Sequence, residues 1–393
     1  MSGSANERLS ELDALRGLAA LTVVLGHFSS AYVDELKLWS GPRSKLIEFG
    51  ALRVFTSGHQ SVLLFFLLSG FVLALPAVRH KPLSYPVFIT RRIFRIYVPY
   101  LAAVFLAIIG NRIWHGPLGL TPWADHTWGV IVRRGLILQH ILFIGQYDNA
   151  QLNTAFWSLV IEMRISILFP LLCLIVLRVK PWISVLVIAL IVSWVWYGQA
   201  SWGLTAVELN FLCGSFFIAG ILLARYRGEA AEWASRLRGR KSWLLLGIAL
   251  CLFWYGSLAP QVIAKVAFHI HNPRYEAFDW GSALGSVLIL TLSLGWRPLQ
   301  GFLLSRVPQF LGKRSYSIYL IHSTCLFMLL HLLAKRLPPE AILLMYLPLV
   351  IASSTLFYRF VEKPAMNYGR RVSQMLDFKG PSAPAIPTMA GAR

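Results

Sequence analysis

The chain has 393 residues, of which 56% are hydrophobic and 14% are charged, and its mean hydropathy is +0.61. This apolar content exceeds what a soluble core uses, so the composition excludes a soluble globular protein and indicates an integral membrane protein. The formal net charge of +20 does not indicate nucleic-acid binding, because the basic residues cluster between apolar runs. The four cysteines lie inside apolar runs without metal-ligand spacing and predict neither disulfides nor a metal site.

Apolar stretches of about 17 to 25 residues are candidates for membrane-spanning helices. In chain order they cover residues 12–30, 62–78, 96–113, 128–144, 155–177, 182–198, 203–224, 243–259, 280–295, 316–334 and 341–360. The stretch 128–144 differs from the others, because it is short and carries Arg133 and Arg134 in its first third. A lipid-facing helix tolerates two adjacent arginines poorly.

The distribution of basic residues favours a stretch 128–144 that does not cross the membrane. If it does not cross, 25 lysines and arginines lie on the cytoplasmic side with both termini and 11 lie on the other side, the excess that cytoplasmic loops carry. The sequence therefore predicts an all-α, polytopic membrane protein of about ten transmembrane helices, with 128–144 as an additional re-entrant or interfacial helix. Both termini are expected in the cytoplasm. Residues 1–371 are expected to form one membrane-embedded domain, and 372–393 a disordered tail rich in Pro, Gly, Ala and Ser.

The first stretch, LDALRGLAALTVVLGHF, keeps charged and titratable residues. Arg16 and His27 are eleven residues apart, which places them on one helical face about 16 Å from each other. Asp13 precedes Arg16 by one turn and is positioned to pair with it. Snorkelling of Arg16 and ordinary packing of His27 explain either residue alone equally well. Together on one face, the two residues indicate a path through the bilayer.

The segment RRIFRIYVPY opens the stretch 96–113 with an arginine pair. Arg92 and Arg95 are one helical turn apart, and their planar forks suit phosphate oxygens, with Arg91 beside them. The alternative is a basic cluster that only fixes topology. In FFLLSGFVLAL, Ser69 and Gly70 form a small-residue notch that would admit either a slender ligand or a neighbouring helix.

A carboxylate lies early in the stretch 155–177, in FWSLVIEMRISILFP. Glu162 is expected about 10 Å below the outer surface, which is the depth expected for His27. A carboxylate in a bilayer needs a partner, and Arg164, two residues further on, faces elsewhere. The sequence therefore predicts that Glu162 pairs with His27 and orients its imidazole as a general base.

A last polar cluster lies in GKRSYSIYLIHS. Ser315, Tyr319 and His322 share one helical face, and Arg314 lies at its start. Ordinary hydrogen bonding between helices is the alternative explanation for this face.

Taken together, the motifs resemble those of the acyltransferase family 3 membrane proteins, which O-acylate extracytoplasmic carbohydrates and some antibiotics. The resemblance runs from about residue 8 to 371 and rests on LDALRGLAALTVVLGHF, FFLLSGFVLAL, RRIFR, FWSLVIEMRISILFP, SYSIYLIH and YRFVEKPAMNYGRR. It implies a ten-helix fold that takes an acyl group, usually acetyl, from cytoplasmic acyl-CoA to a hydroxyl on the other side. It also implies that His27 is the catalytic histidine, that Arg16, Arg92 and Arg95 serve donor binding or catalysis, and that Glu162 is the family's acidic position.

The expected site combines both lines of reasoning. His27, Glu162 and Arg16 are expected to be catalytic, with His27 as general base. The donor is expected to contact Arg91, Arg92, Arg95, Arg314, Ser69, Gly70, Ser315, Tyr319 and His322. The acceptor is expected to be a glycan, a glycolipid or a macrolide-like molecule, and the protein to lie in a bacterial cytoplasmic membrane and to need no metal. The competing hypothesis is a proton- or anion-coupled transporter that uses the same Arg, His and Glu residues.

Overall fold

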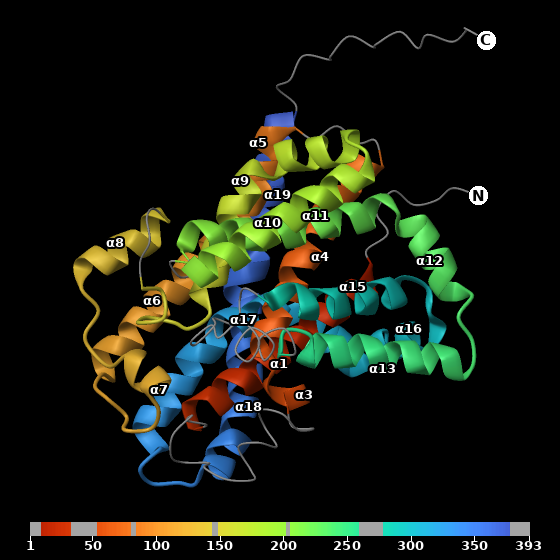
Figure 1. Ribbon diagram of the computed structural model, residues 1–393. Coiled ribbons are helices and arrows are strands. Elements are labelled where there is room, and N and C mark those ends of the chain that lie inside the picture. Colours follow the sequence, from red (N-terminus) through yellow and green to blue (C-terminus); the bar gives the residue numbers. More distant parts are fainter. Residues whose placement is uncertain are drawn as a thin grey trace, which may run out of the picture.

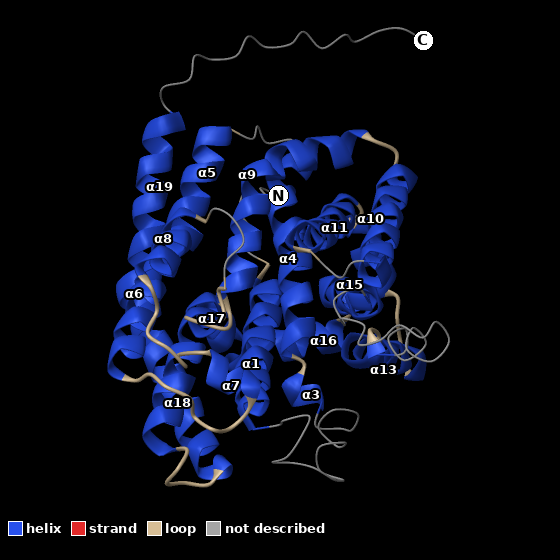
Figure 2. Cartoon of the chain, turned by 60° about the vertical axis from the view of Figure 1, so that its left-hand side comes forward, coloured by secondary structure: helices blue, strands red, loops and turns tan. Residues whose placement is uncertain are grey.

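The computed structural model describes residues 9–32, 53–79, 84–143, 148–201, 205–258 and 278–377, and in these ranges the chain is helical, without strands. Figures 1 and 2 show the helices packed around a central pair, α1 (Ser10–Tyr32) and α17 (Arg306–Leu333). The tail expected from residue 372 begins inside α19 (Lys363–Asp377), and its residues from 378 onward lie outside the described ranges.

Eight helical segments of the described residues are long and apolar enough to cross a membrane, which supports a multi-pass membrane protein. They are α1, α4 (Gly58–Val78), the continuous run α5–η1–α6 (Tyr85–Arg92, Ile93–Tyr97, Val98–Ile113), α9 (Phe156–Arg178), α10 (Pro181–Ser201), α11 (Ala206–Arg225), α17, and the run α18–η3–α19 (Pro339–Phe357, Tyr358–Glu362, Lys363–Asp377). The remaining helices are α3 (Arg53–Thr56), α7 (Pro122–His126), α8 (Arg134–Leu142), α12 (Arg227–Ser235), α13 (Arg240–Tyr255), α15 (Asp279–Gly295) and α16 (Arg297–Leu303).

Two of the ten expected crossings do not appear as long straight helices. The helix α13 has 16 residues in the described part of the chain, and α15 meets α16 at an angle of 92°. The pair α15–α16 counts as a ninth crossing only if the bent pair is one span. Residues 128–144 contain only the nine-residue α8, about 14 Å long, which is too short to cross.

Reciprocal glycine contacts bring the central helices together. A Cβ atom on Gly17 would lie 2.4 Å from the backbone nitrogen of Gly312, and one on Gly312 would lie 2.5 Å from the carbonyl oxygen of Asp13. Gly70 on α4 and Gly220 on α11 face each other's helices in the same way. Without side chains at these positions, backbones of neighbouring helices approach closely.

The helix α1 is more buried than the helices at the edge of the bundle. In its most apolar window, 56% of the α1 residues are buried, against 17% for α10. Figure 2 shows α10 at the edge of the bundle and α1 beside α17 in its middle. The helix α1 therefore lies within the bundle, whereas most of α10 is exposed at its edge.

Two of the long helices contain a π-helical turn, η1 and η3. Each π-turn is followed two residues later by a proline, Pro99 after η1 and Pro364 after η3. A proline has no N–H to donate, and its ring clashes with the carbonyl four residues earlier, so the regular ladder cannot continue through it. The two π-turns carry Arg95 and Glu362, residues that lie close to the candidate site described below.

Candidate active site

Polar side chains recur at every fourth residue along one face of α9 and of the turn that precedes it. These are Thr154, Ser158, Glu162 and Ser166, here called the polar stripe. Each interval is about one helical turn, or 6 Å, so the stripe is about 18 Å long. All four side chains make hydrogen bonds to other helices, which places the stripe in the interior of the bundle.

The first end of the stripe holds two histidines in contact. The Nδ1 atom of His27 lies 2.8 Å from Nε2 of His322 and 3.0 Å from Oγ1 of Thr154. Thr154 in turn donates to Oγ of Ser323 at 3.0 Å. The imidazole of His27 also lies against the indole of Trp123, with 5.4 Å between ring centroids. His322 is fully buried, whereas His27 is partly exposed.

The hydrogen bonds of the two imidazoles define their tautomers. Nδ1 of His322 lies 3.1 Å from the carbonyl oxygen of Ile318, which only accepts, so this nitrogen carries the proton. In the neutral ring, Nε2 of His322 is then an acceptor, and Nδ1 of His27 must donate to it. The Nε2 atom of His27 is thereby left as a free lone pair, and it has no hydrogen-bond partner among the described residues. This is the arrangement of a general base.

The middle of the stripe is buried. Oγ of Ser158 and the hydroxyl of Tyr319 are hydrogen-bonded at 2.6 Å, and both side chains are buried. The ring of Phe65 packs edge-on against Tyr319. Tyr319 lies one turn before His322 on α17, so this hydroxyl pair adjoins the histidine pair.

The second end of the stripe holds a partly buried ion pair. Nη2 of Arg92 donates to Oε1 of Glu162 at 2.8 Å, and Ser69 donates to the same oxygen at 3.0 Å. Arg92 also donates to Oγ of Ser166 from Nε at 3.1 Å and from Nη2 at 2.8 Å. The carboxylate and the guanidinium thus satisfy each other in a site where an unpaired charge would be costly.

Arg16 lies beside this ion pair. Its guanidinium reaches the carbonyl oxygen of Leu68 at 3.4 Å and Asp13 at 3.5 Å, and it lies within electrostatic range of Glu162 and Arg95. The i, i+3 pairing of Asp13 with Arg16 agrees with the prediction. One face of α1 therefore connects both ends of the stripe, with Arg16 at one end and His27 at the other.

The arginine pair of RRIFR is divided by the π-turn. Arg92 is buried and bonded to the stripe, whereas Arg95, inside η1, is exposed. Glu362, inside η3, is buried, accepts a hydrogen bond from Ser317 and lies within electrostatic range of Arg95. The guanidinium of Arg95 is consequently the member of the pair that remains accessible to an anion.

The predicted pair between His27 and Glu162 is wrong. Glu162 contacts Arg92 and Ser69, and His27 contacts His322 and Thr154. Equal depth was inferred by counting from helix ends, which assumes that the ends of α1 and α9 lie in one plane. They do not, because Thr154 precedes α9 and is itself buried beside His27, and Glu162 lies about 12 Å further along.

Several residues expected to contact a donor have other partners. Gly70 packs against Phe217 of α11, so this half of the notch serves helix packing, while Ser69 faces the stripe. Arg91 donates to Ser373 of α19 at 2.9 Å. His322 belongs to the histidine pair. Arg314 stacks on Phe310 with its guanidinium carbon 3.9 Å from the ring centroid, and Ser315 is buried nearby on α17.

Hydrogen bonds connect the short helix α8 and its C-cap to α6 and α9. Nδ1 of His140 lies 2.7 Å from the hydroxyl of Tyr100, and Arg164 donates to the carbonyl oxygen of Phe143 at 3.1 Å. Phe143 ends α8 with a φ of 57°, which directs that carbonyl back towards α9. His140 is fully buried, and burial lowers its pKa to about 4, so it remains neutral at physiological pH.

Sequence reasoning missed Thr154, Ser158, Ser166 and Ser323. The four-residue repeat of polar residues in TAFWSLVIEMRIS was a readable signal for the stripe, because residues at i and i+4 share a helical face. Ser323 follows His322 directly and had no comparable signal. Among the described residues, no group of three or more His, Cys, Asp or Glu side chains is arranged to hold a metal ion.

Comparison with known proteins gives one family and several relatives. A family model described as an acyltransferase domain matches residues 9–359. Curated proteins named "Putative O-acetyltransferase" from Staphylococcus aureus strains COL, MSSA476 and MRSA252 are each 22% identical to the chain over 399 residues and cover 91% of it. The chain spans 57% of the length of these relatives. No solved structure matches the chain.

Proposed function

The chain belongs to acyltransferase family 3, and from this we propose that it is a membrane O-acyltransferase that moves an acyl group, in the simplest case acetyl, from acyl-CoA to a hydroxyl group of a carbohydrate acceptor. The observation that carries the proposal is the free Nε2 lone pair of His27. The contact to His322, itself fixed by Ile318, holds the imidazole in the tautomer that accepts a proton.

The reaction proposed at His27 is a direct transfer. Nε2 of His27 takes the proton of the acceptor hydroxyl as its oxygen forms a bond to the thioester carbonyl carbon. The carbon–sulfur bond then breaks, and the CoA sulfur leaves with the electron pair and takes the proton from the His27 imidazolium. The Nδ1 proton of His27 stays in its hydrogen bonds to His322 and Thr154 throughout, so these residues orient the ring.

The polar stripe supports delivery of the donor from the opposite end. CoA is a polyanion, and the exposed Arg95, near Arg16 and the buried Arg92, offers positive charge where the stripe ends. The pantetheine arm spans roughly two-thirds of the 30 Å hydrocarbon layer, which is close to the 18 Å length of the stripe. In this proposal the nucleotide part stays beside Arg95 and only the thin arm reaches His27.

The proposal also includes the membrane in which the protein lies and its orientation there. Residues 1–371 form the acyltransferase domain in a bacterial cytoplasmic membrane, with both termini and the arginine end of the stripe on the cytoplasmic side. The histidine end then faces the acceptor. The ion pair of Glu162 with Arg92 gives Glu162 a role in holding the arginine end together, in place of the expected contact with the base.

The test measures whether a labelled acetyl group moves from acetyl-CoA to an acceptor sugar. The full chain is reconstituted in vesicles with labelled acetyl-CoA and an oligosaccharide with free hydroxyls, and CoA release and labelled sugar are measured. We expect transfer by the wild type, loss of at least 100-fold in His27→Ala, and normal rates in His331→Gln, a matched histidine on α17 that does not contact His27. Proton or solute flux without thioester consumption would establish a transporter instead.

A further inference from the structure

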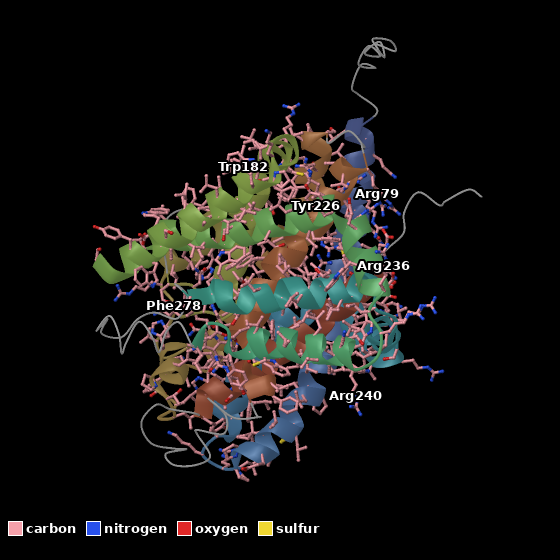
Figure 3. The ribbon with its side chains drawn as sticks, turned by 45° about the vertical axis from the view of Figure 1, so that its right-hand side comes forward. Arg79, Trp182, Tyr226, Arg236, Arg240 and Phe278 are labelled. Carbon is pink, nitrogen blue, oxygen red and sulfur yellow. The ribbon has the colours of Figure 1, made fainter. Side chains whose placement is uncertain are left out.

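A cavity of about 510 Å³ lies apart from the polar stripe, where α12, α13 and α16 meet. These helices form one edge of the molecule in Figure 1, and Figure 3 labels Arg236 and Arg240, which flank the segment between α12 and α13. The lining residues are Ser235, Leu237, Arg238, Gly239, Ser242, Trp243, Trp296, Arg297 and Pro298. The site thus combines two guanidiniums with two indoles.

The two arginines of this cavity are available to a ligand. Arg238 and Arg297 are exposed, and within the described ranges neither has a hydrogen bond or an ion pair to a carboxylate. Arg236 differs, because it pairs with Glu232 one turn earlier on α12 and does not line the cavity. Unpaired guanidiniums from two separate segments around one cavity are a typical arrangement for binding phosphate oxygens.

The floor of the cavity is rigid and apolar. Trp296 is 2% exposed and packs with Ala234 and Leu292 in a small core of its own, separate from the main core. The ring of Trp243 meets that of Trp296 edge to face, with 4.9 Å between centroids. The arginines are therefore held above a preformed surface.

An apolar surface continues from the cavity along α13. Trp243, Leu244 and Ile248 are 59%, 66% and 45% exposed, and they follow one another along the helix from its first turns. Tryptophan beside arginine at the end of an apolar helix is typical of the interface between headgroups and hydrocarbon. The site is thus charged at one end and apolar at the other, which matches an amphiphile better than a soluble anion.

We propose that this cavity binds the headgroup of an anionic phospholipid. The lipid phosphate contacts Arg238 and Arg297, the glycerol region rests on Trp296, and the acyl chains run along the exposed face of Trp243, Leu244 and Ile248. Basic pockets between membrane helices recognise anionic headgroups in this way. An anionic lipid is favoured over a zwitterionic one because no carboxylate in the cavity balances the two arginines.

The test measures retained lipid on the full chain. Wild-type protein is purified from bilayers that contain phosphatidylglycerol or only phosphatidylcholine, and bound lipid is counted by native mass spectrometry. We expect one tightly retained phosphatidylglycerol per chain. Combined Arg238→Gln and Arg297→Gln substitutions should weaken its retention roughly thirtyfold, at about 1 kcal/mol for each arginine. Arg236→Gln is the matched control and should retain the lipid as the wild type does.

Three outcomes would overturn the assignment. Equal retention of phosphatidylcholine would remove the preference for anionic lipid, and unchanged retention in the double variant would place the lipid elsewhere. Displacement of the lipid by millimolar ADP, with ADP bound through the same two arginines, would assign the cavity to a soluble phosphate. Thermal unfolding of the double variant in phosphatidylcholine verifies that both substitutions, at exposed positions, leave the fold intact.

Discussion

The histidine pair shows how a neutral imidazole is able to fix the tautomer of another without a carboxylate. The tautomer of His322 is fixed by the carbonyl of Ile318 on its own helix. His322 in turn fixes the tautomer of His27 across the interface between α17 and α1. Thr154 adds a second acceptor for the same proton. The sequence predicted His27 and His322 as site residues but not their contact, because no spacing relates two residues 295 positions apart.

Replacing His322 tests this orienting role. We expect His322→Ala to lower kcat about 100-fold while the KM for acyl-CoA stays unchanged, because the base loses its tautomer and the donor end is untouched. His322→Gln keeps an acceptor for the Nδ1 proton and should recover part of the rate. An equal loss in both variants, or a raised KM, would argue that His322 does not orient the base.

At the scale of elements, close helix contacts set the distance between the two histidines. His27 and His322 lie on α1 and α17, whose separation is fixed by Gly17 and Gly312. The apolar runs of both helices were predictable from hydropathy. The glycine contact was not, because a small residue in an apolar run gives no indication of which helix it faces.

The variant Gly312→Ala should force α1 and α17 apart. Its Cβ would lie 2.5 Å from the carbonyl oxygen of Asp13, so we expect a free energy of unfolding lower by about 1–3 kcal/mol together with reduced transfer. Gly247→Ala on α13 is the control, because a Cβ there meets nothing within 4 Å. Helix propensity predicts that this control is more stable by about 0.5–1 kcal/mol. Similar thermal unfolding of the two variants would contradict the close contact.

The buried His140 makes the docking of α8 sensitive to acid. The folded-state pKa of His140, about 4, lies below the ordinary value of 6.5. Its contribution to the free energy of unfolding is therefore complete above pH 6.5 and decreases as the pH falls towards 4. The loss amounts to about 2 kcal/mol by pH 5. We expect thermal unfolding of His140→Gln to depend less on pH than that of the wild type between pH 7 and 5. Parallel pH profiles would show that folding does not lower the pKa of His140.

For the whole molecule, composition predicted the class correctly and the shape only in part. The apolar runs identified the multi-pass helical protein, and the nine-residue α8 agrees with a non-crossing element at 128–144. The bend between α15 and α16 lies at Trp296, directly after the predicted stretch 280–295, and hydropathy gives no angle between that stretch and the helix that follows it.

Orientation in the membrane is tested with single cysteines in a variant that lacks the four native ones. With both termini in the cytoplasm, Glu232→Cys on α12 should be protected from an impermeant maleimide in intact cells, and Asp148→Cys before α9 should react. Both side chains are exposed, so access to the thiol is not limiting. The reverse labelling pattern would invert the topology and place the arginine end of the stripe outside.

A spacing of four residues has a geometric consequence for anything that moves along α9. Each step advances 400° around the helix, so from Thr154 to Ser166 the row winds by about 120° as it rises. This winding explains why its first residue meets α1 and α17 while its last meets α5. In the proposed function the donor's arm follows this curved row, which a chain of freely rotating single bonds is able to do and a straight, stiff molecule is not.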